Sequence, residues 1–407
     1  MSFLLLWTLP VLWLAALAAI LLWYLRDIGR LWREPVLRCP VLVLESDDWG
    51  AGPPAQATAL NDMAALLGGF QDTSGQVPVM SLAVVLSVPD GKAIAAEKGP
   101  YQRTCLDEPS LSTVLDALKQ GEAEGVFSLQ LHASEHFWPN TLMGSVDPKV
   151  RSWLSQPVPA WTEELPPHLQ SRWTDASSLP SRSLPQHAVD LAVKEEIEIY
   201  KRVIGSTPRV VVPPTFIWTP YVERAWAANG IQCIVTPGQR YTFLAADGSH
   251  IADGAKFANG DCSGDITYLV RYDYFEPARG RDAGYALHAL GRASSEGRPC
   301  ILENHRVNFC RDTAVHRTSL EELEKLIAGA LSLMPTIRFL SSCELLRVLK
   351  EQDPQWVARH FNERFPCFWR RLRHSGRLWK LLKLSGLALP GELLTRWALC
   401  SVKPSHV

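Results

Sequence analysis

The sequence predicts an α/β protein built on an irregular (β/α) barrel of about seven or eight mostly parallel strands. Three observations support this fold class. Short apolar runs of strand length alternate with stretches that space apolar residues by three and four. Several of these runs are apolar throughout, as expected of strands that are covered on both faces. Acids and histidines follow three of the runs, at the strand ends where barrels of this kind hold their functional groups.

The strand-like runs lie within residues 35–350, which we interpret as the barrel domain. They cover residues 41–46, 79–86, 126–132, 209–213, 231–236, 266–272, 300–305 and 337–340. Helical spacing is present in residues 111–120, 187–204, 220–228, 282–294 and 319–333. Ser319 and Glu322 have the spacing of a capping box and predict the start of the last helix.

Two stretches interrupt this alternation. Residues 155–185 are rich in Pro, Ser and Trp and lack periodicity, which predicts a long insertion loop over the barrel mouth. Residues 241–251 read as a hairpin that turns at Asp247 and Gly248.

The N-terminal residues 1–34 predict a transmembrane anchor with a basic flank. Residues 3–25 carry no charge and would span about 35 Å as a helix, which is enough for a bilayer core. The anchor lacks the basic start of a signal peptide, so we expect it to be retained. Arg26, Arg30 and Arg33 follow it directly. By the positive-inside bias we expect a single-pass protein of a bacterial inner membrane, with the barrel on the cytoplasmic face.

The C-terminal residues 351–407 predict a basic amphipathic segment that lies on the membrane surface. Residues 366–400 interleave Lys and Arg with Trp, Phe and Leu, a pattern that suits an anionic leaflet. The alternative is a basic helix that packs on the globular domain.

Composition excludes some classes of partner and site. The formal net charge is −1 and the isoelectric point is near 6.8, so nothing indicates nucleic acid. The nine cysteines include no C-x-x-C spacing, which argues against a disulfide scaffold and against a zinc ribbon.

The strand ends supply a set of groups that could bind a divalent metal and hydrolyse a bond. Asp48 follows the first run, and His132 and His136 follow the third with H-x-x-x-H spacing, which gives the three ligands of a catalytic metal site. Asp47, beside the ligand, could remove a proton from water. His305, at the end of the run 300–305, could return a proton to a leaving group.

These residues resemble the motifs of the polysaccharide deacetylases of carbohydrate esterase family 4, a divergent match over about residues 38–345. Glu45-Ser-Asp-Asp-Trp-Gly50 is similar to the family's Asp-Asp motif, His132-Ala-Ser-Glu-His136 to its two-histidine motif, and Ile301-Leu-Glu-Asn-His305 to its late histidine motif. The resemblance implies a (β/α) barrel, Asp47 as base, Asp48, His132 and His136 as ligands, and His305 as acid.

The chain departs from the family pattern at several positions. Trp49 and Ala133 replace a Gly and a Ser or Thr, and Arg209 lies four positions before Pro213 instead of beside it, so its role as partner of the base is open. We predict that Asp273 orients His305, because an imidazole needs a fixed tautomer to act as an acid.

We therefore expect a membrane-anchored hydrolase that uses a divalent metal, by default zinc, to remove an N-acetyl or other N-acyl group from an amino sugar. A barrel on the cytoplasmic face would favour a lipid-linked sugar. One alternative is a glycoside hydrolase that pairs Asp47 or Asp48 with Glu303 or Asp273 and needs no metal. Another is a non-catalytic membrane scaffold in glycan assembly, in which Asp47→Asn would leave the phenotype intact.

Overall fold

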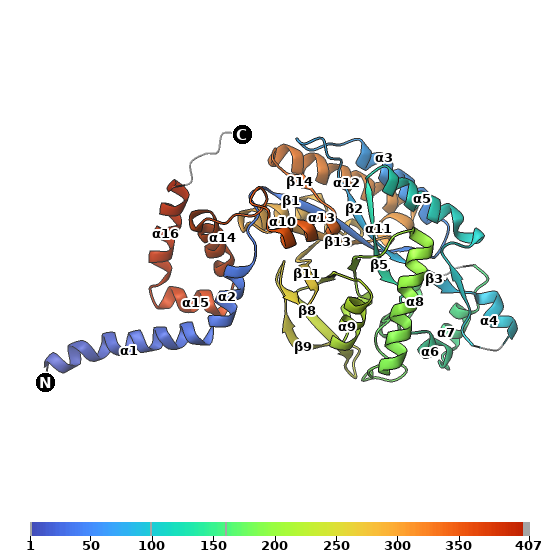
Figure 1. The fold of residues 1–407 in the computed structure, drawn as a ribbon, viewed down its shortest axis with the longest axis horizontal. Coiled ribbons are helices and arrows are strands. Elements are labelled where there is room, and N and C mark those ends of the chain that lie inside the picture. Colours follow the sequence, from blue (N-terminus) through green and yellow to red (C-terminus); the bar gives the residue numbers. More distant parts are fainter. Residues whose placement is uncertain (1, 98–99, 159–160, 402–407) are drawn as a thin grey trace.

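The computed structural model describes residues 2–97, 100–158 and 161–401, and it leaves aside the side chains of residues 2–7, 9, 10 and 97. The fold is a mixed α/β protein whose central sheet curls into a barrel-like shape, with helices packed on its outer face (Figure 1). The strand order is β10-β11-β7-β6-β5-β2-β1-β13-β12, and β14 also pairs with β1.

Eight neighbouring strands of this order, β11 to β12, run parallel, and β10 is antiparallel at one edge. In the described part of the chain β12 does not pair with β10 or β11, so the barrel stays open between them. The strands of this sheet are β1 (Val41–Gly50), β2 (Met80–Val85), β5 (Phe127–Ala133), β6 (Val210–Val211), β7 (Cys233–Thr236), β10 (Cys262–Ser263), β11 (Ile266–Val270), β12 (Asp273–Tyr274), β13 (Cys300–His305) and β14 (Arg338–Phe339).

Each of the eight predicted strand runs contains a strand of this sheet, which supports the predicted fold class in its coarser form. Two hairpins lie beside the sheet, one formed by β3 (Ser87–Pro89) and β4 (Arg103–Cys105), and one by β8 (Gln239–Leu244) and β9 (His250–Lys256). The second hairpin turns where the sequence predicts, and Asp247 accepts hydrogen bonds from the backbone and the hydroxyl of Ser249 in its turn.

The helices that cover the sheet bury apolar faces against it. They are α3 (Gln56–Gly68), α5 (Ser112–Ala123), α8 (Gln186–Ile204), α9 (Pro220–Ala228), α10 (Ala283–Ser295), α11 (Val307–Cys310) and α12 (Thr313–Leu333). The predicted capping box at Ser319 is wrong. Helix α12 begins six residues earlier, after Asp312, whose side chain accepts from the backbone N–H groups of Ala314 and Val315. Ser319 is buried within the helix.

Helix α13 (Ser342–Glu351) closes the amino-terminal end of the barrel. Its side chains Leu345, Leu346 and Leu349 pack with Val41 and Val43 of β1 in one buried cluster. Its first residue, Ser342, donates a hydrogen bond from its hydroxyl to Glu45. The barrel interior is therefore a packed core at this end, and the cavity lies at the other end.

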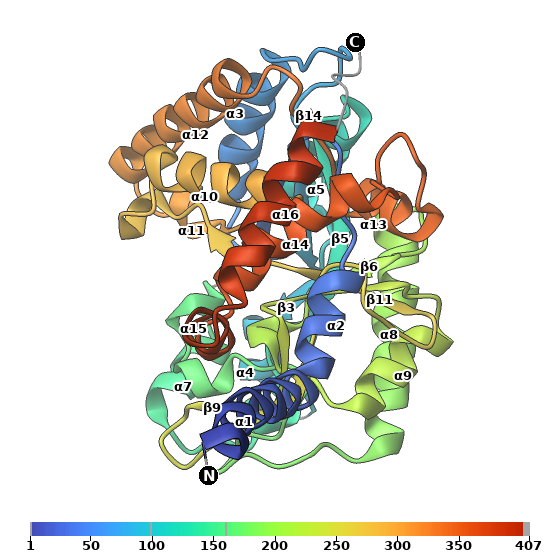
Figure 2. The ribbon, with the colours of Figure 1, turned by 90° about the vertical axis from the view of Figure 1, so that its left-hand side faces the viewer.

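The helices near the two ends of the chain lie together on one side of the molecule, away from the sheet (Figure 1). Helices α1 (Ser2–Trp23) and α2 (Leu25–Arg33) lie there with α14 (Phe361–Arg373), α15 (Arg377–Leu384) and α16 (Ala388–Ser401). Phe365, Trp369 and Leu372 of α14 form an apolar cluster with side chains of α2. Figure 2 shows the ribbons of these terminal helices on one side of the molecule. This part of the C-terminal segment therefore packs on another helix of the protein, as in the alternative interpretation of its sequence.

The predicted membrane anchor lies partly outside the residues whose side chains are described. Among the described residues, no helix alone combines the length and the apolar character that crossing a bilayer requires. Residues 11–23 and α2 meet that requirement only as a pair, bent by 58° at the break between them. Residues 402–407 of the predicted C-terminal segment also lie outside the description.

The remaining short elements lie in the connections between these units. They are α4 (Gly91–Glu97), α6 (Pro139–Met143) and α7 (Pro148–Leu154), and the single 3-10 turns η1 (Pro109–Leu111), η2 (Thr162–Glu164), η3 (Pro167–Leu169), η4 (Pro214–Phe216) and η5 (Pro277–Arg279).

Candidate metal centre and active site

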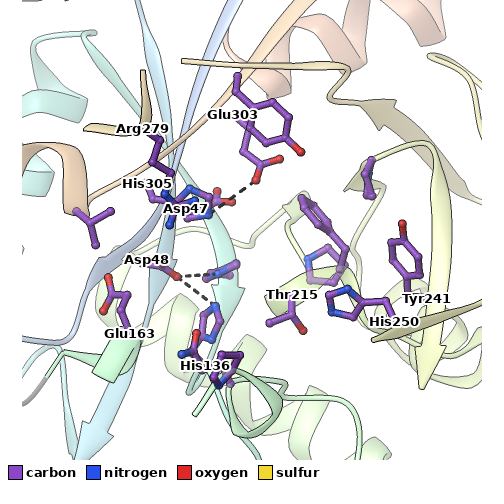
Figure 3. A pocket seen from close by; sticks show the side chains of 18 of the residues that line it. Asp47, Asp48, His136, Glu163, Thr215, Tyr241, His250, Arg279, Glu303 and His305 are labelled. Carbon is purple, nitrogen blue, oxygen red and sulfur yellow. Dashed lines mark ion pairs between the residues drawn. The ribbon is translucent and has the colours of Figure 1, made fainter. Parts of the chain in front are cut away.

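A cavity of about 600 Å³ opens at the carboxyl ends of β1, β5 and β13 (Figure 3). Five of the six predicted site residues line it: Asp47, Asp48, His132, His136 and His305. The sixth, Asp273, is absent from its walls. These residues are up to 258 positions apart in the chain, as 47 and 305 are. They meet here because parallel strands end at the same edge of the barrel.

A β-bulge directs both aspartates of β1 into this cavity. Along a regular strand, neighbouring side chains point to opposite faces. Between the pairs Ser46–Leu82 and Trp49–Val84, however, Asp47 and Asp48 stand opposite a single residue of β2. Asp48 adopts a left-handed backbone with φ of 74°, which is uncommon for a residue other than glycine. The extra residue re-aims the Asp48 carboxylate, so two adjacent acids serve one cavity.

A second irregularity positions His132. In β5 it is the extra residue between Leu131, paired with Val84, and Ala133, paired with Val85. Its Nδ1 lies 2.7 Å from the carbonyl oxygen of Val212. A carbonyl can only accept, so Nδ1 donates, and in the neutral imidazole Nε2 then keeps a free lone pair that faces the cavity.

Asp48, His132 and His136 converge on one point. The Nε2 atoms of both histidines lie 3.2 Å from the Asp48 Oδ1 atom, and all three ligand atoms are within 4.8 Å of one another. All three residues are buried. Yet the Asp48 Oδ1 and His132 Nε2 atoms make no well-formed hydrogen bond with any described residue.

Buried polar atoms without partners cost free energy, which makes this geometry expensive in a protein that binds nothing there. One carboxylate oxygen and two imidazole nitrogens are a donor set that a divalent ion of the zinc type accepts, with positions left for water and substrate. The residues present therefore fit a catalytic divalent metal.

Asp47 is held as an ionised carboxylate by Arg271. The guanidinium donates from Nη1 to Asp47 Oδ2 at 2.5 Å and from Nη2 to Oδ1 at 2.8 Å, and its Nε donates to Glu45. Burial raises the pKa of Asp47, but the charge and hydrogen bonds of Arg271 outweigh burial, so the pKa is lowered. Asp47 is thus charged at neutral pH and able to accept a proton.

His305 stands beside Asp47 on the neighbouring strand, since the two residues pair in the β1–β13 register. Its Nδ1 lies 2.5 Å from Glu276 Oε1, and Glu276 Oε2 accepts from Asn308 at 2.8 Å. Burial lowers the pKa of His305, but the bond to Glu276 and the charges of Asp48 and Asp47 raise it to about 10. The imidazole is therefore protonated at neutral pH.

Asp273 does not orient His305, which corrects the sequence-based prediction. It pairs with Leu302 in the β12–β13 register, and Leu302 belongs to the core outside the barrel. Strand alternation therefore turns Asp273 outward, where Arg292 binds it at 2.6 Å. Glu276, three residues later, takes the predicted role.

Arg209 is not the partner of the base. Its side chain is exposed on the barrel surface and donates to Gln232 at 3.1 Å. The partner is Arg271, which sequence reasoning missed. The signal was present, because Arg271 is a cation near the end of the strand-like run 266–272, and in the structure it directly follows β11 of the same barrel.

Other buried charges fix the loop that carries His136. Glu135 is fully buried and binds Arg172 at 2.8 Å and Arg103 at 3.0 Å. Arg172 also donates to the Phe137 carbonyl at 3.2 Å. Arg172 belongs to the segment 155–185, which also supplies Glu163, Pro167 and Gln170 to the cavity wall. Glu163 is held by Arg306 through two hydrogen bonds of 2.9 and 3.0 Å.

Glu303 is the remaining acid of the cavity. Its carboxylate lies 3.8 Å from His305 Nε2 and 3.9 Å from Arg271 Nη1. Burial raises its pKa to about 6 in spite of those two cations. Tyr241 and His250 of the β8–β9 hairpin, whose rings lie 5.1 Å apart, and Thr215 lie across the cavity from Asp48 and Glu163 (Figure 3). Phe216 also lines the cavity.

Comparison with known proteins gives one family match over part of the chain. The model of glycosyl hydrolase family 57 matches residues 171–275. This stretch contains Arg271 and the hairpin but none of the three candidate metal ligands. No curated protein matches the sequence.

Several solved structures share a distant likeness to the backbone. A protein of Mycobacterium smegmatis named as a polysaccharide deacetylase has 10% identity and a TM-score of 0.41, over 78% of this chain and 94% of that one. The 4-alpha-glucanotransferase of Thermococcus litoralis has 9% identity and a TM-score of 0.38, over 76% of this chain and 40% of that one. The peptidoglycan deacetylase PdaC of Bacillus subtilis has 10% identity and a TM-score of 0.34, over 79% of this chain and 94% of that one. What the site can do is therefore judged from its own geometry.

Proposed function

We propose that this protein is a metal-dependent hydrolase that removes an N-acetyl or other N-acyl group from an amino sugar. One observation carries the proposal: a buried Asp-His-His donor set lies in the same cavity as a carboxylate held ionised and an imidazole held protonated. These are the three parts that amide hydrolysis needs. The match of residues 171–275 to a glycosyl hydrolase family supports a carbohydrate as the substrate class.

A divalent ion held by Asp48, His132 and His136, with zinc as the default, would supply a positive charge that polarises the amide carbonyl and acidifies water. Asp47 accepts the proton that water loses as its oxygen bonds to the carbonyl carbon. Arg271 keeps Asp47 ionised and fixes its orientation. His305 donates its Nε2 proton to the amide nitrogen as the C–N bond breaks, and Glu276 stabilises the imidazolium until then.

The test is metal content together with product release. Purified protein is expected to hold about one divalent ion per chain and to release acetate or another acyl acid from an N-acylated amino sugar. His132→Ala is expected to lose both, whereas His250→Ala, which alters the cavity but no ligand, keeps the metal. A wild-type protein that binds no divalent ion would contradict the proposal.

A glycoside hydrolase is the second candidate, favoured by the family match. The outward position of Asp273 leaves Glu303 as the partner for Asp47 or Asp48. The pKa of about 6 for Glu303 suits a general acid at mildly acidic pH. Chelation separates the candidates, because a carboxylate pair keeps its activity in EDTA and the deacetylase does not. The scaffold alternative predicts that Asp47→Asn preserves the cellular phenotype.

We further propose that the chain is anchored in a membrane with the barrel on the cytoplasmic side, so that the sugar is lipid-linked. The support is the apolar helix α1, with exposed Leu22 and Trp23, followed by the basic helix α2. Exposed Leu389 and Trp397 on α16 add apolar surface at the same end of the molecule. Alkaline phosphatase fused after Val407 is expected to be inactive, and an active fusion would place the barrel outside.

A further inference from the structure

A second cavity, of about 1030 Å³, lies between α2 and the strands β9 to β11, on the side of the molecule that carries the terminal helices (Figure 2). We call it the α2 cavity. Its walls include Arg26, Arg30 and Arg33 from α2 and Arg240 and Lys256 from the β8–β9 hairpin. The hairpin separates it from the candidate active site, because Tyr241 and His250 of the same hairpin line that other cavity.

Helix α2 has two chemically different faces. The three arginines follow one another at intervals of four and three residues, which places them on one side of the helix. Ile28, Leu31 and Trp32 belong instead to the apolar cluster with α14. The packing against α14 therefore fixes the rotation of α2 so that its basic side faces the cavity.

The cavity has a surplus of positive charge that the protein does not neutralise. Arg30 pairs with Asp27 at 3.2 Å, and Arg240 pairs with Asp253 at 2.7 Å and with Glu223 at 3.0 Å. Among the described residues, no acid forms an ion pair with Arg26, Arg33 or Lys256.

The acids in the cavity wall form no ion pair with those three cations, although the charges of Arg30 and Arg33 act on Asp261 from a longer distance and oppose the rise of its pKa. Glu34 is buried and already bound by Arg298 at 2.7 Å, with Arg371 at 3.6 Å. Asp261 accepts a hydrogen bond from the Ala258 backbone, and burial raises its pKa.

A buried hydroxyl adds a neutral donor to the same cavity. Tyr268 lines the cavity and is 1% exposed. Glu223 and Ser263 lie near its hydroxyl, but no hydrogen bond of good geometry reaches the oxygen from the described residues. A phosphate group suits several separate N–H donors together with an O–H donor, because it offers charged acceptor oxygens in several directions.

We propose that the α2 cavity binds a phosphate group, and that this phosphate belongs to a membrane lipid. A lipid is favoured over a free phosphate because the cavity begins where α1 ends. Leu22 and Trp23, the last apolar residues of α1 before the arginines, are 71% and 84% exposed. A lipid bound there would place its chains along α1 and its headgroup on α2. The proposal that the ligand is a lipid rests on the proposed membrane anchoring, whereas the proposal that the cavity binds a phosphate group does not.

The test uses the full chain purified in a non-ionic detergent and measures the Kd for dioctanoyl phosphatidic acid by calorimetry. Dioctanoylglycerol, which lacks the phosphate, is the matched probe. Wild type is expected to bind the phosphatidic acid and not the glycerol lipid. In Arg26→Gln/Arg33→Gln the Kd is expected to rise at least about tenfold, because two charge-assisted contacts are lost. Both arginines are exposed, so the variant is expected to fold.

The control variant is Arg377→Gln/Lys380→Gln, which removes the same charge from the exposed surface of α15 and leaves the α2 cavity intact. Its Kd is expected to stay near the wild-type value. Equal loss in the two double variants would mean diffuse attraction and would overturn the site. A third arm uses inorganic phosphate at millimolar concentration. If it binds wild type but not Arg26→Gln/Arg33→Gln, and displaces no lipid, the phosphate site stands. The proposal that the phosphate belongs to a lipid is then overturned. Because binding is measured without turnover, a failure of the proposed hydrolase leaves this result untouched.

Discussion

Arg271 at the end of β11 binds both oxygens of Asp47 on β1 and also bonds to Glu45, two residues earlier on the same strand. Val43, Glu45 and Asp47 point into the barrel because strand side chains alternate. One guanidinium therefore joins two acids stacked along the interior. This guanidinium links strands that are far apart in the sequence. It therefore couples the stability of the barrel to the ionisation of Asp47, the candidate base.

Arg271→Lys is expected to impair both stability and catalysis. An ammonium group keeps the charge but cannot bind Asp47 with two parallel bonds and reach Glu45 as well. We expect a loss of about 2 kcal/mol in the free energy of unfolding and at least about tenfold in kcat/KM. Denaturant unfolding and steady-state kinetics measure these. Arg209→Lys is the matched control, since Arg209 is exposed, and an equal effect of the two changes would contradict this role.

Glu276→Gln is expected to move the alkaline limb of the pH–rate profile to lower pH. The acid must carry a proton, so activity falls as pH rises through the pKa of His305, which is raised to about 10. Without the negative charge of Glu276 that pKa falls, by about one unit or more. Asp273→Asn, at the position predicted from sequence, is expected to leave the limb in place. If the alkaline limb instead moved in Asp273→Asn and stayed in place in Glu276→Gln, Asp273 and not Glu276 would be the carboxylate that orients His305.

Glu196→Gln is expected to change how stability depends on pH. Glu196 accepts hydrogen bonds from Trp226 at 2.8 Å and from the Ser134 backbone at 3.3 Å, and burial raises its pKa to about 7. Because the folded pKa lies above the unfolded one, this contribution to stability is complete below about pH 4.5 and lost as pH rises to about 7.

Replacing Glu196 by glutamine removes the ionisation. The variant should therefore gain about 3 kcal/mol relative to wild type between pH 4.5 and pH 8. Urea unfolding at the two pH values gives the difference, and parallel curves for the two proteins would contradict it.

Arg172→Met is expected to weaken metal binding from outside the donor set. The change leaves the buried Glu135 with one cation and releases the Phe137 carbonyl, so the loop that carries His136 loses two of its contacts. We expect metal affinity to fall about tenfold. Arg103→Met removes the more exposed partner of Glu135 and should have a smaller effect on affinity. A larger effect of Arg103→Met would place the support elsewhere.

Most of the fold could be predicted because apolar runs report burial directly. All eight predicted runs contain strands, since strands covered on both faces stay apolar along their length. The short strands β3, β4, β10 and β12 have no such signal. The sequence misplaces the start of α12 because Ser319 and Glu322 match a capping pattern that the tertiary structure does not use, and Asp312 caps the helix instead.

The candidate site was predictable where residue type and strand end coincide. Asp48, His132 and His136 meet as expected, but the two bulges that aim Asp48 and His132 depend on pairing with β2, which a single sequence does not display. The sequence does not single out Glu276 as the carboxylate beside His305, and the alternation that turns Asp273 outward depends on its register with Leu302. The pairing of Arg271 with Asp47 could not be predicted, because the two residues lie 224 positions apart in the chain and only the tertiary structure brings them together.

The closure of the barrel floor by α13 has a consequence for synthesis of the chain on the ribosome. Strand β1 is made among the first fifty residues, yet its neighbours β13 and β14 and the hydroxyl that bonds Glu45 emerge near the end. Until Ser342 has left the ribosomal tunnel, the nascent barrel has an open base and an incompletely satisfied acid in its interior. Strand β1 is thus the first strand to be translated but among the last to form all of its contacts. We expect the nascent chain to require a chaperone until Ser342 has emerged.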